Sequence, residues 1–173
     1  MIAGVLVVRA TMDVLKALRR GGTRPAAEPP PSTTTLGDWY ATLVRMRHSA
    51  WVLAIAEKTC LPIVVTGREL RTVPHRMTET LVELLAELGV SAEAANRERE
   101  QMSEVVFART NSRSHLGVLN TFQYSLQIAF DENPSWNLLE ASRWLAETPI
   151  IARDLFPDIA TCELFGAPRP DRR

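Results

Sequence analysis

Hydrophobic positions in this chain follow two spacings, one typical of strands and one typical of helices. Apolar runs of strand length lie at residues 5–8, 39–44, 50–56, 61–65 and 105–107. In the second run, successive side chains alternate as they do in a strand that has two different faces. Pro62 indicates a strand start or a sheet edge, because proline cannot donate to a ladder. Short links between the second, third and fourth runs predict an antiparallel meander.

Helical spacing predicts helices at about 12–19, 74–88, 92–103 and 136–146, and one more before the break at residues 133–134. Thr11, Ser91 and Ser135 are the expected caps of three of them. The polar run 93–101 is interpreted as a solvated helix face. Residues 150–165 show no clear pattern. The elements together predict a single α+β domain with a mainly antiparallel sheet of about four or five strands and helices packed on one face.

Two segments lie outside this pattern. Residues 23–35 are rich in proline and threonine, which predicts a mobile surface loop rather than a central strand. Residues 167–173 have the composition of a disordered tail. We therefore expect one domain over residues 1–166 that carries the loop, followed by the tail.

Residues 105–130 form the most informative stretch, because they predict a short buried strand, a polar turn and a long helix. Ser112 or Ser114 can cap this helix, since a serine oxygen accepts from a free backbone N–H one turn further on. A core-facing stripe follows at spacings of three and four: Leu116, Leu119, Phe122, Leu126, Ala129 and Phe130. A second stripe beside it consists of Arg113, Gly117, Asn120, Tyr124 and Gln127.

Gly117 is unusual because an interior glycine costs a helix about 1 kcal/mol relative to alanine. It indicates that something approaches the backbone closely. A ligand or partner could lie along the second stripe; alternatively, another element packs on Gly117 and the polar groups are structural. The candidate binding residues, expected to share one accessible concavity, are Asn111, Arg113, Ser114, His115, Gly117, Asn120 and Tyr124.

Composition narrows the function classes only slightly. The chain of 173 residues is 46% hydrophobic and 23% charged, with a formal net charge of zero. Net charge therefore does not indicate nucleic acid as a partner, although it does not exclude it. No apolar run reaches membrane-spanning length, and the run at 5–8 is too short for a signal sequence. Two cysteines far apart in sequence are expected to stay reduced, which favours a cytoplasmic protein.

The common catalytic motifs are missing from the sequence. There is no phosphate-binding glycine loop, HExxH, CxxC or GxSxG, and the three histidines are scattered, so neither a metal nor a cofactor is predicted. Glu57 and Lys58 could belong to a nuclease-like site, in which a carboxylate holds a metal and a lysine contacts phosphate. The simpler interpretation is a polar hairpin turn between two strands.

The chain resembles a family of short bacterial proteins known as a domain of unknown function. The resemblance covers about residues 5–157 and rests on LGDWYATL at 36–43, the turn EKT at 57–59, VVFARTNSRSHLGVLN at 105–120 and the pair TP at 148–149. The family's central motif is similar to TxNRSxLGxMN. Ser112 and Leu119 depart from it, and the matching positions are Asn111, Arg113, Ser114, Leu116, Gly117 and Asn120. The resemblance implies a single fold and no reaction.

Two functions follow from the candidate residues. The first is a non-catalytic protein that holds a protein partner or a small ligand at residues 110–127. It predicts a pocket or apolar patch at Gly117 without converging acid and base groups. The second is an enzyme acting on nucleic acid or a phosphorylated small molecule. In that case Arg113 contacts phosphate, the backbone at Ser114–His115 cradles it, and His115 is the acid or base. The first is favoured, because no acid and base pair and no set of metal ligands is visible in the sequence; the enzyme is the alternative.

Overall fold

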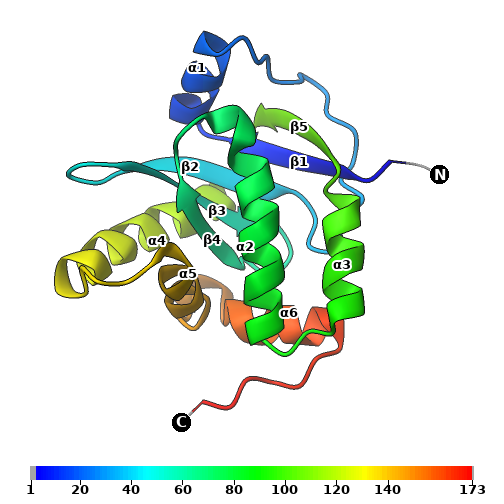
Figure 1. Ribbon diagram of the computed structural model, residues 1–173, viewed down its shortest axis with the longest axis vertical. Coiled ribbons are helices and arrows are strands. Elements are labelled where there is room, and N and C mark those ends of the chain that lie inside the picture. Colours follow the sequence, from blue (N-terminus) through cyan, green and yellow to red (C-terminus); the bar gives the residue numbers. More distant parts are fainter. Residues whose placement is uncertain (1–2, 173) are drawn as a thin grey trace.

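A computed structural model describes residues 3–172. Its sheet is formed by β1 (Val5–Ala10), β2 (Trp39–Arg45), β3 (Ala50–Ala56), β4 (Pro62–Thr66) and β5 (Glu104–Arg109). The α-helices are α1 (Met12–Arg20), α2 (Val73–Glu87), α3 (Ala92–Gln101), α4 (Arg113–Glu132), α5 (Leu138–Ala146) and α6 (Pro157–Phe165). Two short 3-10 helices, η1 (Leu70–Thr72) and η2 (Ile151–Arg153), join them (Figure 1).

The strand order across the sheet is β4-β3-β2-β1-β5. Strands β2, β3 and β4 form the predicted antiparallel meander, and β4 is an edge strand that begins at Pro62. Strand β1 lies between β2 and β5 and runs parallel to both. The class of a single α+β domain with a mostly antiparallel sheet is confirmed, and β1 adds a parallel part to it.

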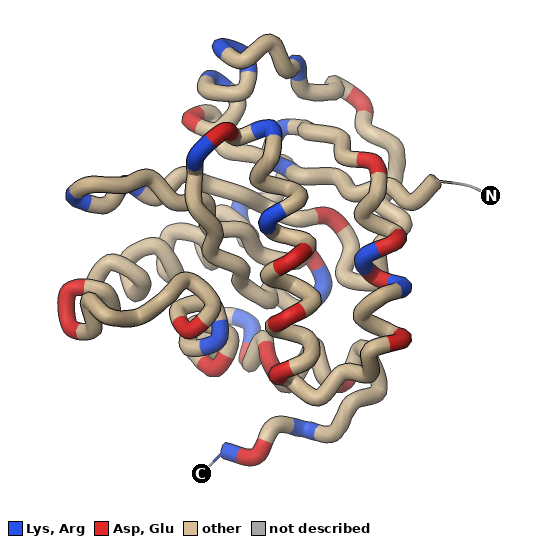
Figure 2. The backbone as a smooth tube through the Cα atoms, viewed as in Figure 1, with Lys and Arg blue, Asp and Glu red and all other residues tan. Residues whose placement is uncertain are grey.

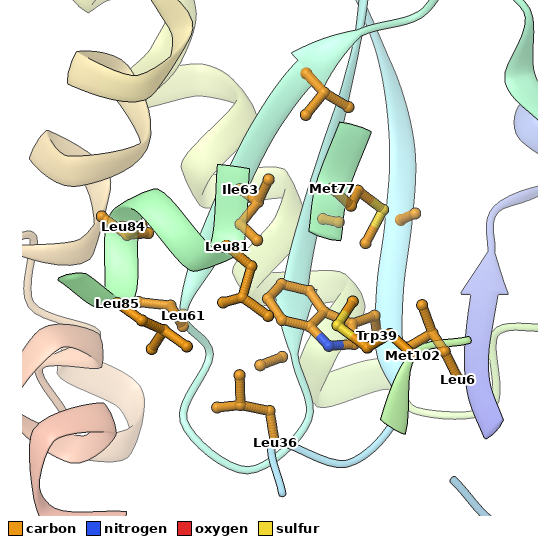
Figure 3. Close-up of a cluster of buried hydrophobic side chains, with 14 of the residues drawn as sticks. Leu6, Leu36, Trp39, Leu61, Ile63, Met77, Leu81, Leu84, Leu85 and Met102 are labelled. Atoms are coloured by element: carbon orange, nitrogen blue, oxygen red, sulfur yellow. The ribbon is translucent and has the colours of Figure 1, made fainter. Parts of the chain in front are cut away.

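Helices cover both faces of the sheet, whereas the sequence pattern placed them on one. Figure 1 shows α2 and α3 across one face and α4 and α5 on the other. On the α2 face, Trp39 packs with apolar residues of β3, β4, α2 and α3 (Figure 3). On the α4 face, Leu53 and Ile55 pack against Phe122 and its neighbours. Strand β3 is apolar at nearly every position because both of its faces are buried, which is the reason its pattern could not show alternation.

Helix α3 is anchored to the domain by a buried carboxylate. Glu98 is 1% exposed, and its two oxygens accept from the backbone N–H groups of Thr35 and Leu36 at 2.8 and 3.0 Å. The interpretation of residues 93–101 as a wholly solvated face was therefore wrong at this position. A buried carboxylate is stable in this place because both oxygens have donors.

Segment 23–35 is attached to the sheet. Ala26 forms a parallel bridge to Ala108 of β5, and its N–H donates to the Phe107 carbonyl at 2.7 Å. Thr33 exchanges bonds with Val5, because its N–H donates to the Val5 carbonyl at 2.9 Å and its Oγ1 accepts from the Val5 N–H at 2.8 Å. Strand β2 pairs with β1 only at Val8–Ala10. The segment therefore supplies hydrogen-bond partners for the start of β1, which β2 does not reach.

The structure changes two local predictions, for β5 and for the cap of α5, and it also assigns residues 150–165 and places residues 167–172. Strand β5 is an edge strand in which only Ala108 is fully buried, so the expected buried strand is half-buried. Helix α5 is capped by Asn137 instead of Ser135, in a reciprocal capping box with Glu140. The unassigned residues 150–165 contain η2 and α6. Residues 167–172 lie against the domain, since Arg172 pairs with Asp158 at 2.6 Å and stacks over Phe156.

Candidate functional site

The polar turn between β5 and α4 is closed by Ser112. Its Oγ accepts from the His115 backbone N–H at 3.3 Å, which makes Ser112 the N-cap, one of the two serines predicted for that role. The same oxygen lies 2.7 Å from His115 Nδ1. The first turn of α4 is therefore held by a serine that contacts both the backbone and the side chain of one residue.

His115 points into the protein rather than toward solvent. Its ring stacks on Tyr40, with centroids 4.3 Å apart and planes inclined by 4°. Its Nε2 lies 2.9 Å from the Glu57 carbonyl oxygen. If Nε2 carries the proton and donates to that carbonyl, Nδ1 accepts from Ser112, so both ring nitrogens are engaged. His115 thus joins α4 to the turn after β3.

Tyr40 extends this connection to the residues before α4. Its hydroxyl donates to Asn111 Oδ1 at 2.6 Å. Burial of the ring and the nearby Glu57 carboxylate raise the pKa of Tyr40, so the phenol remains a donor at neutral pH. Asn111 is accordingly bonded to β2 in the structure.

A cavity of about 460 Å³ lies beside the first turns of α4. One wall is a flank of α4, and the other is the segment 149–153 that contains η2. Its lining residues are Arg113, Ser114, Gly117, Val118, Thr121, Phe122, Pro149, Ile150, Ile151, Ala152 and Arg153, and we call it the Gly117 cavity. A Cβ placed on Gly117 would meet no heavy atom within 4 Å beyond the adjacent helix backbone. No element of the described chain packs on this glycine, and its open side faces the cavity.

Two arginines are the titratable groups of the cavity. Arg153 is half-buried: its Nε and Nη2 donate to Ser114 Oγ at 3.2 and 2.7 Å, and its Nη1 donates to Cys60 Sγ at 3.1 Å. Arg113 is exposed. Within residues 3–172, neither guanidinium forms an ion pair with a carboxylate. The wall therefore carries two positive charges that the fold itself does not neutralise.

Cys60 lies behind Arg153 in the interior. Burial raises the pKa of the Cys60 thiol, and the Arg153 guanidinium opposes that shift. The backbone at Cys60 has a φ of 55°, in the left-handed region that non-glycine residues seldom adopt. The thiol serves here as the acceptor that fixes one side of the guanidinium.

The structure divides the sequence-predicted residues into three groups. Arg113, Ser114 and Gly117 line the cavity. Asn111 and His115 are bonded toward Tyr40 and the turn after β3, as described above. Asn120 and Tyr124, the latter 67% exposed, lie outside the cavity on the solvent side of α4.

Helix geometry explains why the predicted stripe does not follow the cavity. Steps of four residues rotate by about 40° around a helix, so the line from Arg113 through Gly117 to Thr121 turns toward the flank that borders segment 149–153. A step of three rotates back by about 60°, which returns Asn120 to the solvent side. The second wall was missed because residues 150–165 have no periodic pattern. The structure shows that Ile151 of this wall is 90% exposed, which the sequence could not indicate.

Among residues 3–172, no group of three or more His, Cys, Asp or Glu side chains is arranged to hold a metal ion. The described helices include none that is long and apolar enough to cross a membrane.

Comparison with known proteins places the chain in a family. A search of curated proteins found no significant match. The sequence profile of a family described as Domain of unknown function (DUF6933) matches residues 7–158. This range includes the whole sheet except its first two residues, all of α4 and α5, and both walls of the Gly117 cavity. The expectation that the chain is a domain of unknown function is confirmed, and the chain belongs to the DUF6933 family.

Proposed function

We propose that this protein binds a small organic molecule in the Gly117 cavity and does not transform it. The supporting observation is the cavity itself, an open space of about 460 Å³ walled mainly by apolar side chains and bordered by two arginines. This volume lies within the range of about 300–1,000 Å³ that small-molecule sites occupy. Apolar walls with a few polar groups at one end are typical of binding sites, where the walls supply affinity and the polar groups set orientation.

The contacts of His115 favour binding over catalysis. A general acid or base needs a ring nitrogen within hydrogen-bond reach of the substrate. Both nitrogens of His115 are engaged, at 2.7 Å with Ser112 Oγ and at 2.9 Å with the Glu57 carbonyl. Within the described residues, the lining of the cavity contains no carboxylate, histidine or cysteine. Arginine is not deprotonated in proteins and serves as a donor only.

Substitution of Gly117 by leucine tests this proposal. A Cβ at Gly117 would meet no heavy atom within 4 Å beyond the adjacent helix backbone, so the leucine variant should fold and place its side chain in the cavity, where it takes space from a ligand. We expect 1-octanol, a neutral amphipathic probe, to shift the backbone NMR signals of the cavity walls in the wild type and not in Gly117→Leu. Asn120→Leu is the matched control, because it adds the same side chain to the exposed side of the helix. Equal shifts in wild type and Gly117→Leu would refute the proposal.

We also propose that the protein is bacterial and cytoplasmic. Cys60 and Cys162 are both buried free thiols in the structure. Free thiols persist in a reducing compartment, which supports this location.

A further inference from the structure

We infer that the natural ligand is an organic anion, with a carboxylate or phosphate head at the arginine end of the Gly117 cavity and a compact apolar body against the other walls. This inference rests on the proposed function and adds the chemical class of the ligand. It follows from three features of the described walls: the hydrogen bonds of Ser114, the two arginines without acidic partners, and the apolar residues that make up most of the lining.

The hydroxyl of Ser114 has an unused hydrogen-bond donor. A serine hydroxyl has two acceptor lone pairs and one O–H donor. Arg153 Nε and Nη2 both donate to Ser114 Oγ, at 3.2 and 2.7 Å, which occupies its acceptor capacity. The O–H hydrogen is then free to point elsewhere, and no acceptor for it is found among residues 3–172. A group that accepts hydrogen bonds is therefore the natural partner for Ser114.

Arg153 is held in place with part of its donor capacity unused. A guanidinium has five N–H groups. Three of them point to Ser114 Oγ and Cys60 Sγ, and Nη1 also lies 3.5 Å from His115 Nε2, which leaves an N–H of Nη2 without a partner among the described residues. These contacts fix the plane of the guanidinium from behind, so less side-chain entropy is lost when an anion binds the remaining N–H. A fixed guanidinium with a free donor matches the geometry of carboxylate and phosphate oxygens.

Arg113 adds a second positive charge at the same end. In the described part of the chain, its guanidinium makes neither a hydrogen bond nor an ion pair, and no acidic residue lines the cavity. Figure 2 shows Asp and Glu on several of the surrounding helices, so acidic residues are available in the fold but are absent from these walls. A ligand with a negative head would neutralise the pair, whereas a cation would be repelled by both.

The other lining residues select an apolar body. Val118 and Phe122 belong to the buried stripe of α4, and Pro149, Ile150 and Ile151 face them from the second wall. Val118, Phe122 and Ile150 are already buried, so an apolar group would mainly cover Pro149 and Ile151, which are exposed; each Å² removed from water favours binding by about 25 cal/mol. Ile151 in particular is 90% exposed without a ligand. The cavity therefore combines two arginines with a mainly apolar lining, a combination that suits an amphipathic anion.

The test compares four probes with the same chain and different heads: octanoate, octyl phosphate, 1-octanol and octylammonium. Dissociation constants come from NMR titrations that follow the amide of Gly117. We expect octanoate or octyl phosphate to bind at least tenfold more tightly than 1-octanol, and octylammonium to bind more weakly than 1-octanol. The stronger of the two anions identifies the head group.

Arginine variants locate the head. Arg113→Met removes no hydrogen bond of the described structure, so it should fold and lower the affinity for the anions about tenfold while leaving 1-octanol unchanged. Arg153→Met should act in the same direction, with its melting temperature as a check on folding. Arg97→Met, which removes an exposed arginine paired with Glu93 on α3, is the matched control and should have no effect. If 1-octanol or octylammonium binds as tightly as the anions, the ligand class is wrong and the binding function stands; if no probe shifts Gly117, both proposals fail.

Discussion

Replacing Gly117 by alanine should stabilise the protein. Gly117 is the fifth residue of α4, and its backbone does not require glycine, since it is not among the residues with positive φ. The added methyl group would meet no heavy atom within 4 Å beyond the adjacent helix backbone. The substitution therefore changes the helix propensity of one position without adding or removing a tertiary contact.

The expected size of the effect follows from that propensity. Glycine in a helix interior costs about 0.8–1.0 kcal/mol relative to alanine, mainly because the unfolded chain gains more backbone freedom with glycine. Since no packing term offsets it, the free energy of unfolding should rise by about 1 kcal/mol. For a domain of this length, such a gain raises the melting temperature by about 2–4 °C.

Urea denaturation followed by circular dichroism gives the free energy, and differential scanning calorimetry gives the melting temperature. Gly22→Ala is a suitable control, because Gly22 also has open space around it but has a φ of +84°. That backbone conformation costs an L-residue about 1–2 kcal/mol, so the same chemical change should destabilise the protein there. The two substitutions should have opposite signs.

A decrease in stability, or no change, in Gly117→Ala would refute the reasoning. It would mean that a surface absent from the monomer, such as a second copy of the chain, packs on this glycine. Sedimentation velocity of the wild type would then be expected to show self-association that the alanine variant weakens.

Other substitutions and conditions probe separate parts of the fold. Glu98→Ala should lower the free energy of unfolding by about 2–3 kcal/mol, because two backbone N–H groups lose their acceptor; a loss below 1 kcal/mol in urea denaturation would contradict the anchoring role. Asn137→Ala should cost about 1 kcal/mol through loss of the capping box, whereas Ser135→Ala should be neutral, and thermal melts that rank them otherwise would exclude the assigned cap. Burial raises the pKa of both the Cys60 and Cys162 thiols. The unfolded chain therefore loses these protons first as pH rises, so stability should be constant below the ordinary thiol pKa and fall above it. Urea midpoints measured from pH 7 to 10 check this sign, and a rise over the alkaline range would contradict it.

Much of the fold could be predicted from local patterns. The meander β2–β4, the edge position of Pro62 and the amphipathic helix α2 each depend on residues within one element or its immediate link. The distribution of helices over two faces could not be predicted, because it depends on which side of the sheet each crossover passes. Strand β3 is apolar on both sides, and only the structure shows that helices cover both of its faces.

Only one wall of the candidate site, the flank of α4, could be predicted from the sequence, for a similar reason. Arg113, Ser114 and Gly117 stand out because a polar cluster and an interior glycine begin one long helix. The facing wall is an irregular segment whose position depends on α5 and α6 rather than on its own sequence. Arg153 therefore carries no local signal, although its bonds to Ser114 complete the cationic end of the cavity.

The two edge strands of the sheet are occupied by other parts of the chain. Along β4, every second residue directs its backbone N–H away from β3. Of these residues, Pro62 has no N–H, and the Val64 N–H donates to Ser142 of α5 at 2.9 Å. On β5, the Phe107 carbonyl is bonded to the N–H of Ala26. These contacts interrupt the row of free backbone groups with which a strand from another molecule would pair along each edge. Growth of fibrils or ribbons through this sheet is disfavoured, and any higher-order assembly is directed to the helical surfaces.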